Sequence, residues 1–116
     1  MRKFTVVKSH ISEFPNPIHF CKGDILSVGD EYVGDEGWEN WLECRFNNLQ
    51  GFVPKQIIQL IDSKSAIAIE DYTALELNVV TGETLTSTRE INQWIWAKNS
   101  KNQEGWVPLC HLQEEL

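Results

Sequence analysis

The sequence predicts an all-β fold: two small barrels in tandem, each of about five strands, closely packed. Three observations lead to this prediction. Four sequence blocks recur in the same order at an offset of roughly 55 residues. Short runs rich in Val, Ile, Leu and aromatic residues alternate with clusters of Gly, Asn, Asp and Ser, which is typical of strands and turns. No segment keeps a helical hydrophobic period over three turns.

The repeated blocks place the expected strands along both copies. In the first copy they read PIHF at 17–20, KGDIL at 22–26, WLECR at 41–45 and GFVPKQI at 51–57. In the second copy they read ELNV at 76–79, TGETL at 81–85, WIWAK at 94–98 and GWVPLCH at 105–111. One match could arise by chance, whereas four in the same order indicate duplication of one unit.

Local chemistry defines the strand ends and faces. GFVP and GWVP each put a proline at the end of a strand, where its missing N–H costs least. The run PKQIIQLI begins at a proline and is short, so it predicts a single 3₁₀ turn. In WIWAK, alternation puts Ile95 and Ala97 in the core, and Trp94 and Trp96 on the outer face with Lys98.

The segment DSKS, residues 62–65, is the expected linker. It gives two predicted domains at 1–61 and 65–116. Because the linker is so short, we expect the two barrels to pack closely against each other.

The composition favours a soluble, acidic chain. Seventeen acidic against ten basic residues give a formal net charge of −7. Such a chain repels phosphate backbones, which argues against a nucleic-acid partner and favours a basic one. No apolar run reaches the roughly 18–20 residues of a membrane span, and the N-terminus lacks a signal-peptide pattern, so we expect no membrane contact and a cytoplasmic location.

The cysteines and histidines form no pattern for metal binding or catalysis. Cys21, Cys44 and Cys110 are odd in number and widely spaced, which is typical of free thiols in a reducing compartment. No C-x-x-C or H-x₃₋₅-H spacing exists to hold zinc. Cys44 falls on a core position of its strand, and no phosphate-binding glycine loop is present. We therefore expect no metal, no cofactor and no enzymatic activity.

Together the blocks resemble the Src-homology-3 (SH3) domain, twice in tandem. The family pattern is ALYDY, an acidic loop, ELSF-x-x-GD, a tryptophan strand and a G-aromatic-V-P block. The second copy is similar over AIEDYTALELNVVTGETL, QWIWAK and EGWVPLCHL, and the first over PIHFCKGDIL, NWLECR and QGFVPKQII, with VVKSH in the ALYDY place. The GWVP block after a W-x-W strand looks like bacterial members. The resemblance implies five-stranded SH3-like barrels and a non-catalytic binding module.

The resemblance also implies a ligand surface on the second unit. Family members bind proline-rich peptides in grooves lined by aromatic rings, with acidic side chains holding a basic ligand residue. The positions that match are Tyr72, Glu76, Trp94, Trp106 and Pro108. Glu70 and His111 stand where the family has tyrosines.

The first unit departs further from the family pattern. Trp41, Phe52 and Pro54 match ligand-facing positions, and Lys8 and His10 replace the two tyrosines of ALYDY. Neither unit therefore keeps the full row of stacking tyrosines.

An acidic insertion lengthens the first unit between Leu26 and Trp41, where the sequence GDEYVGDEGWENW holds five acids and no base. It is either a solvated loop whose aromatic residues cover the barrel, or a surface on which Glu36 and Trp38 grip a Lys- or Arg-containing partner.

Three function classes remain open. The first is a protein- or peptide-binding module with a basic or proline-containing ligand. The second is a structural or regulatory unit that uses its groove for packing between barrels or for homodimerisation, with Trp96 packed against the first barrel or a second chain. The third is a small-barrel nucleic-acid binder, which the charge argues against.

Overall fold

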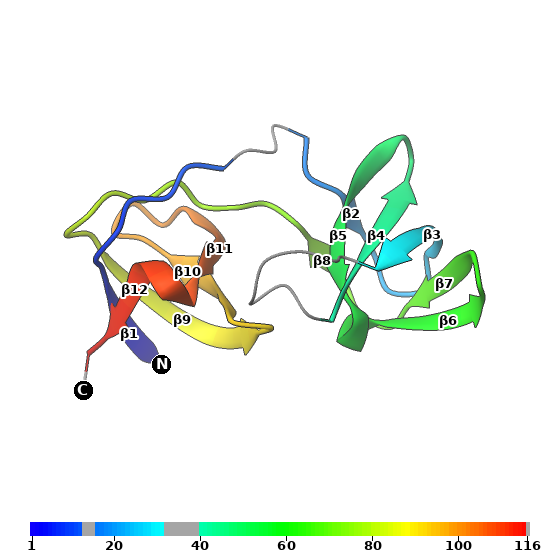
Figure 1. The fold of residues 1–116 in the computed structure, drawn as a ribbon. Helices are drawn as coiled ribbons and strands as arrows, with labels where there is room; N and C mark the ends of the chain where they lie inside the picture. Colours follow the sequence, from blue (N-terminus) through cyan, green and yellow to red (C-terminus); the bar gives the residue numbers. More distant parts are fainter. Residues whose placement is uncertain (13–15, 32–39, 116) are drawn as a thin grey trace. The chain divides into compact units, whose positions relative to one another are not determined.

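A computed structural model describes residues 1–12, 16–31 and 40–115, which form an all-β fold with no α-helix in these ranges (Figure 1). The regular structure consists of short strands and two single turns of 3₁₀ helix. None of the helical segments in the described residues is long and apolar enough to cross a membrane.

One five-stranded antiparallel sheet joins the two ends of the chain. Its order is β11-β10-β9-β1-β12. The first strand, β1 (Arg2–Val6), lies between β9 (Thr84–Ile91) and β12 (Leu112–Glu114). The other two strands are β10 (Trp94–Lys98) and β11 (Glu104–Pro108). The N-terminal strand of the first copy therefore completes the sheet of the second.

The other five-stranded sheet has the corresponding order, β5-β4-β3-β7-β6. Its strands are β3 (Ile25–Glu31), β4 (Trp41–Phe46), β5 (Leu49–Pro54), β6 (Ile58–Asp62) and β7 (Ser65–Ala68). A two-stranded sheet pairs β2 (His19–Phe20) with β8 (Tyr72–Thr73). The start of the second copy, from β7 to β8, thus belongs with the strands of the first copy.

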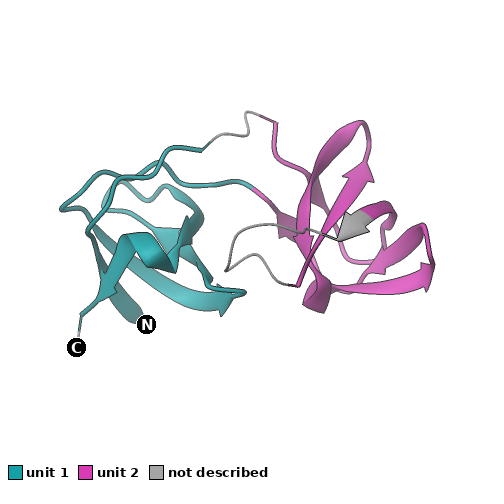
Figure 2. Cartoon of the chain, in the orientation of Figure 1, with its two compact units in different colours: residues 1–15, 75–116 teal, residues 16–74 magenta. Residues whose placement is uncertain are grey.

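The chain divides into two compact units (Figure 2): unit 1 holds residues 1–15 and 75–116, and unit 2 holds residues 16–74. This division differs from the predicted domains at 1–61 and 65–116. The two copies have exchanged their first strands, so unit 2 is continuous in sequence and unit 1 is not.

The physical reason lies in the connection between β6 and β7. Asp62 faces Ser65 across the two strands, and only Ser63 and Lys64 separate them. The Lys64 N–H donates to Asp62 Oδ1 at 2.8 Å, and hydrogen bonds from Lys64 and Ser65 hold the pKa of Asp62 below its ordinary value. A two-residue connection closes an antiparallel hairpin. The segment predicted to link two barrels is therefore a turn inside one sheet.

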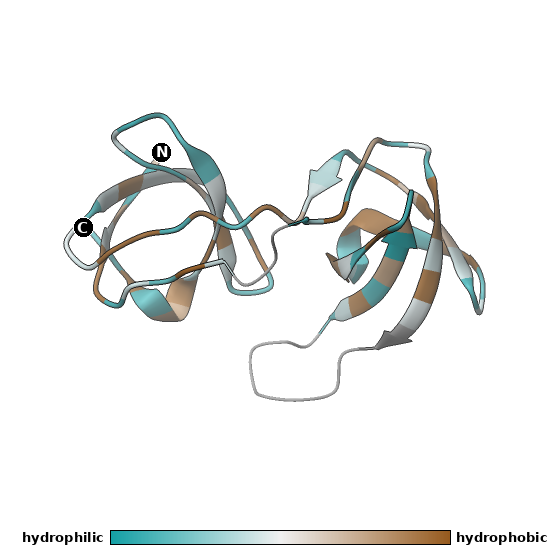
Figure 3. Ribbon diagram, turned by 90° about the horizontal axis from the view of Figure 1, so that it is seen from above, coloured by the Kyte–Doolittle hydropathy of each residue, from teal (hydrophilic) through white to brown (hydrophobic). Residues whose placement is uncertain are grey.

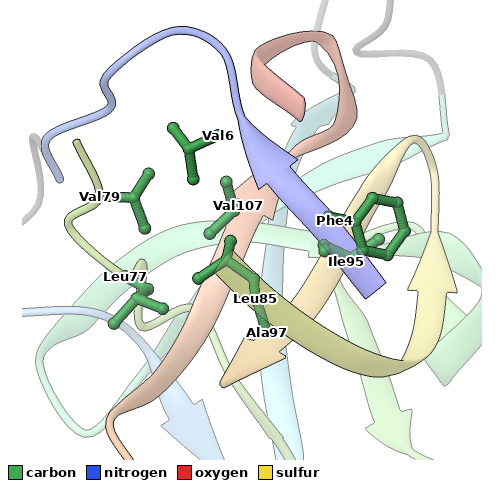
Figure 4. Packing of buried hydrophobic residues seen from close by; sticks show 8 residues of the cluster. All are labelled: Phe4, Val6, Leu77, Val79, Leu85, Ile95, Ala97 and Val107. Atoms are coloured by element: carbon green, nitrogen blue, oxygen red, sulfur yellow. The ribbon is translucent and has the colours of Figure 1, made fainter. Parts of the chain in front are cut away.

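The core of unit 1 shows the same exchange (Figure 4). It contains Phe4 and Val6 from β1 together with residues of the second copy, namely Leu77, Val79, Leu85, Ile95, Ala97 and Val107. Phe4 and Val6 alternate with more exposed neighbours along β1, as strand geometry requires. The predicted core positions Ile95 and Ala97 are confirmed.

The core of unit 2 is built in the same way from the other first strand. Ala66 and Ala68 of β7 are buried, as are Ile18, Leu26, Cys44 and Val53. Hydrophobic and hydrophilic residues alternate along the strands (Figure 3). The predicted burial of Cys44 is confirmed.

The two 3₁₀ turns follow the strand-ending prolines. Turn η1 (Lys55–Ile57) follows Pro54, and turn η2 (Leu109–His111) follows Pro108. The prediction of a single 3₁₀ turn after Pro54 is confirmed. Turn η1 leads into β6 and turn η2 into β12, each at one edge of its sheet.

Two glycines allow a second segment to pass close to a sheet. A Cβ on Gly105 would lie 2.6 Å from the Leu77 backbone nitrogen, and one on Gly51 would lie 2.8 Å from Ile18 Cγ2. The two positions correspond, because Gly51 faces Cys44 and Gly105 faces Ala97 across their strands. The missing side chain of Gly105 therefore leaves room for the segment at Leu77, and that of Gly51 for the segment at Ile18.

We predict that Gly105→Ala lowers the free energy of unfolding by about 1–3 kcal/mol, because the new methyl group meets backbone that must move. Gly51→Ala should cost less, since the atom in its way is the end of a side chain. Gly29→Ala is the control, because its Cβ would make only ordinary contact at 3.5 Å with Glu43. Urea denaturation of the three variants checks this order, and equal stability of all three would contradict it.

Candidate functional site

The outward face of β10 and β11 carries an aromatic cluster. Trp94 faces Pro108 and Trp96 faces Trp106 across the two strands. The two indoles of the Trp96–Trp106 pair meet edge to face, with ring centroids 5.4 Å apart. Trp96 also donates its indole N–H to Glu104 Oε1 at 3.2 Å. Strand pairing thus brings three tryptophans and a proline onto one face.

The segment after β1 covers one end of this face. His10 is held in place by two backbone hydrogen bonds of 2.9 Å with Val79, one in each direction. Its ring stands edge-on to Trp94 at 5.7 Å and to His111 at 5.3 Å. His111 in turn lies with Nδ1 at 3.1 Å from the carbonyl oxygens of Lys8 and Ser9. Because carbonyl oxygens only accept, Nδ1–H is the donor in these contacts.

A carboxylate completes the cluster. Glu76 Oε1 lies 2.6 Å from His10 Nε2, and the two side chains are only 10% and 15% exposed. Glu76 is placed by β11, since its neighbours Leu75 and Leu77 exchange backbone hydrogen bonds with Trp106. A short, shielded contact of this kind is strong when an ionised group takes part. We name His10, Glu76, Trp94, Trp106, Pro108 and His111 the His10 cluster.

The structure brings together most of the site predicted for the second copy. Glu76, Trp94, Trp106, Pro108 and His111 all lie in unit 1. Tyr72 does not, which differs from its predicted place among them. It belongs to unit 2, where its hydroxyl donates to the Phe52 carbonyl at 3.2 Å and its ring lies 5.6 Å from Phe20. The exchange of first strands thus assigns Tyr72 to unit 2.

His10 takes the position that sequence order gave to Tyr72. Sequence order assigned Lys8 and His10 to the first unit, with Trp41, Phe52 and Pro54, and the structure places both in unit 1 instead. One sequence signal for this was the short DSKS segment between the two copies, which in the structure leaves only Ser63 and Lys64 between the paired strands.

Trp94 is less open than predicted. Its side chain lies on the outward face of β10, yet only 7% of the residue is exposed. The His10 ring packs against the Trp94 indole, at a position where the family pattern has a tyrosine. Trp96 is half-buried, and its contacts with Trp106 and Glu104 lie within its own unit. The predicted contact of Trp96 with the other barrel or with a second chain stays a prediction.

The corresponding face of unit 2 is more polar. Trp41 faces Pro54, and Glu43 faces Phe52, where unit 1 has Trp96 and Trp106. Glu43 accepts a hydrogen bond from Gln50 and lies 3.8 Å from Arg45. The predicted ligand residues Glu36 and Trp38 lie outside the described residues.

The described part of the chain contains no group of three His, Cys, Asp or Glu side chains that could hold a metal ion. Cys44 is buried, and this burial, with the nearby Glu43 charge, raises the pKa of its thiol to about 11. A thiol with so high a pKa is a poor nucleophile at neutral pH.

We predict that two of the three thiols react with Ellman's reagent in the folded chain at pH 7.5. Cys21 and Cys110 are exposed, whereas Cys44 is buried. Cys44 should react only after unfolding, as burial both blocks access and disfavours the thiolate. Counting reacted thiols with and without urea checks this, with Cys44→Ala as the control that removes the urea-dependent step. Rapid reaction of a third thiol in the folded chain would contradict it.

No curated protein matched the chain. The family model of the variant SH3 domain matches residues 3–61, just over half of the chain, from β1 through most of β6. The chain belongs to the variant SH3 domain family.

Proposed function

We propose that this protein is a non-catalytic tandem SH3 module that binds a protein or peptide segment on the outward face of β10 and β11 in unit 1. Membership of the SH3 family supports a role in protein interaction. The observation that carries the proposal is the aromatic face itself, where the half-buried Trp96 lies together with the buried Trp94, Trp106 and Pro108. Aromatic and proline side chains of this kind receive extended, proline-containing segments because such segments lose little entropy on docking.

The charges near this face favour a ligand with a basic residue. The acid predicted to hold that residue, Glu76, is already engaged by His10 at 2.6 Å. Glu104 is exposed, and its carboxylate lies at the rim of the face, where it accepts the Trp96 N–H. A guanidinium or ammonium group at Glu104 would also lie near the Trp96 ring, where charge pairing and cation–π attraction add. We therefore assign the basic residue of the ligand to Glu104.

Trp96→Ala should lower the affinity for a bound peptide by on the order of 2 kcal/mol, roughly thirty-fold, if Trp96 is a main contact. Trp96 suits this test better than Trp94, because removing the buried Trp94 would also destabilise unit 1 by about 3–5 kcal/mol. The probes are ten-residue peptides with a Pro-x-x-Pro core and a flanking arginine, measured by calorimetry. Glu43→Ala, the corresponding position of unit 2, is the matched control.

Two outcomes would count against this proposal. If Trp96→Ala bound every peptide as tightly as the wild type, the face would not be the ligand site. If neither protein bound any peptide, but sedimentation showed wild-type dimers that Trp96→Ala loses, a structural role through homodimerisation would replace it. The contacts that already engage Trp94 and Glu76 within unit 1 are consistent with a structural use of these two side chains.

Glu104→Gln should weaken binding of an arginine-containing peptide by about threefold to tenfold, in keeping with a partly exposed charge pair of 1 kcal/mol or so. The loss should shrink as salt is raised, because mobile ions screen exposed charges. Glu115→Gln, a second exposed acid of unit 1, should leave affinity unchanged. A peptide with the arginine replaced by alanine should bind Glu104→Gln and the wild type with equal affinity. If Glu104→Gln weakened the binding of both peptides equally, Glu104 would not be the partner of the basic residue.

A further inference from the structure

The exchange of first strands raises a question that the short turn alone does not answer. The turn at Ser63 and Lys64 keeps β7 beside β6. It does not explain why residues 2–10, here named the N-terminal segment, suit unit 1. We infer that the N-terminal segment is built specifically for unit 1 and that the two first strands are not interchangeable, independently of the turn. This inference does not rest on the proposed binding function.

Strand register identifies the corresponding positions in the two units. Phe4 faces Leu85 of β9, and Ala66 faces Leu26 of β3. Val6 faces Leu112 of β12, and Ala68 faces Ile58 of β6. Phe4 therefore corresponds to Ala66, and Val6 to Ala68.

The cores differ in the volume that they offer to these positions. Phe4 and Val6 are each 1% exposed, and Ala66 and Ala68 are 0% and 2% exposed, so all four sites are closed by their neighbours. A phenylalanine and a valine in the place of two buried alanines would overpack unit 2. Two alanines in the place of Phe4 and Val6 would leave cavities in unit 1. Each first strand therefore fits the unit in which it lies.

Charged side chains at the sheet surface also favour unit 1 over unit 2 as the place of the N-terminal segment. Arg2 donates to Glu114 at 2.8 and 2.9 Å and to Glu90 at 2.7 Å. Glu114 faces Phe4, and Leu60 faces Ala66, so the residue of unit 2 that corresponds to Glu114 is a leucine. Exposed pairs contribute little to stability, but Arg2 would lose its Glu114 partner on unit 2.

The end of the N-terminal segment adds a third, more buried match. His10 meets Glu76 in unit 1 at 2.6 Å. In the aligned blocks PIHF and ELNV, Glu76 corresponds to Pro17, which cannot pair with an imidazole. Core volume, surface charge and a shielded His–Glu contact thus all direct the N-terminal segment to unit 1. Its docking also places His10 and the carbonyl groups that hold His111, so the His10 cluster is assembled only when this strand is in place.

The test removes the turn constraint and asks which unit the N-terminal segment chooses. A ten-residue Gly/Ser linker inserted between Ser63 and Lys64 in the full chain opens both arrangements at a small entropic cost. Pairs of introduced cysteines then report which unit the N-terminal segment joins. The chain also carries Cys21→Ser and Cys110→Ser, so that these two native thiols cannot form disulfides. Thr5→Cys with Thr84→Cys can cross-link only when β1 lies on unit 1, since these residues face each other there. Thr5→Cys with Ile25→Cys reports the alternative, because Ile25 faces Ile67 at the corresponding place.

We expect the disulfide between positions 5 and 84 to form in at least tenfold excess over the disulfide between positions 5 and 25. Mass spectrometry of the digested chains measures this ratio. An intermolecular disulfide between the same two positions would also support the inference, because the strand would still have chosen unit 1. If the disulfide between positions 5 and 25 dominated instead, the inference would be overturned. The turn would then be the only cause of the strand exchange.

A second chain tests the core directly. The linker-inserted chain with Phe4→Ala, Val6→Ala, Ala66→Phe and Ala68→Val exchanges the core volumes of the two strands. The ratio of the two disulfides should shift toward the Thr5–Ile25 pair by at least fivefold. An unchanged ratio, in a chain whose circular dichroism still shows folded sheet, would contradict core volume as the determinant.

Discussion

The arrangement of this protein depends on one constraint, the two-residue turn between β6 and β7. Asp62 and Ser65 are paired across the hairpin, so the last strand of the first copy and the first strand of the second copy must be neighbours in one sheet. Once β7 fills that place in unit 2, β1 has no place there and completes unit 1 instead. A connection long enough to leave the sheet would have allowed two barrels in sequence, which is why a short hinge favours exchange of strands.

The same constraint decides the composition of the candidate site. Residues from the start of the chain, His10 and the Lys8 and Ser9 carbonyl groups, meet Glu76, Trp94 and His111 from the second copy. The carboxylate that the family pattern assigns to a basic ligand is thereby engaged within the molecule, and Glu104 remains as the accessible acid beside Trp96. A surface that sequence order placed within one repeat is in fact made by both.

The two units have diverged around a common strand order. Unit 1 carries Trp96 and Trp106 as a facing pair, whereas unit 2 carries Glu43 and Phe52 at those positions, with Glu43 bound to Gln50. The close approach of a second segment to a glycine is common to both, at Gly105 and at Gly51. The outer faces differ while the strand order is retained, because the fold depends on the inner face.

The sequence by itself determined the elements that depend on local chemistry and on strand alternation. It predicted the all-β class, the burial of Ile95, Ala97 and Cys44, and the 3₁₀ turn after Pro54. Only the tertiary structure decided which sheet each first strand joins, and with it the assignment of Tyr72 to unit 2 and of His10 to the unit that holds Trp94. The reason is that β1 and β7 alternate in the same way, so local pattern cannot tell their partners apart. That choice is made by a turn and by the volume of cores assembled from residues distant in sequence.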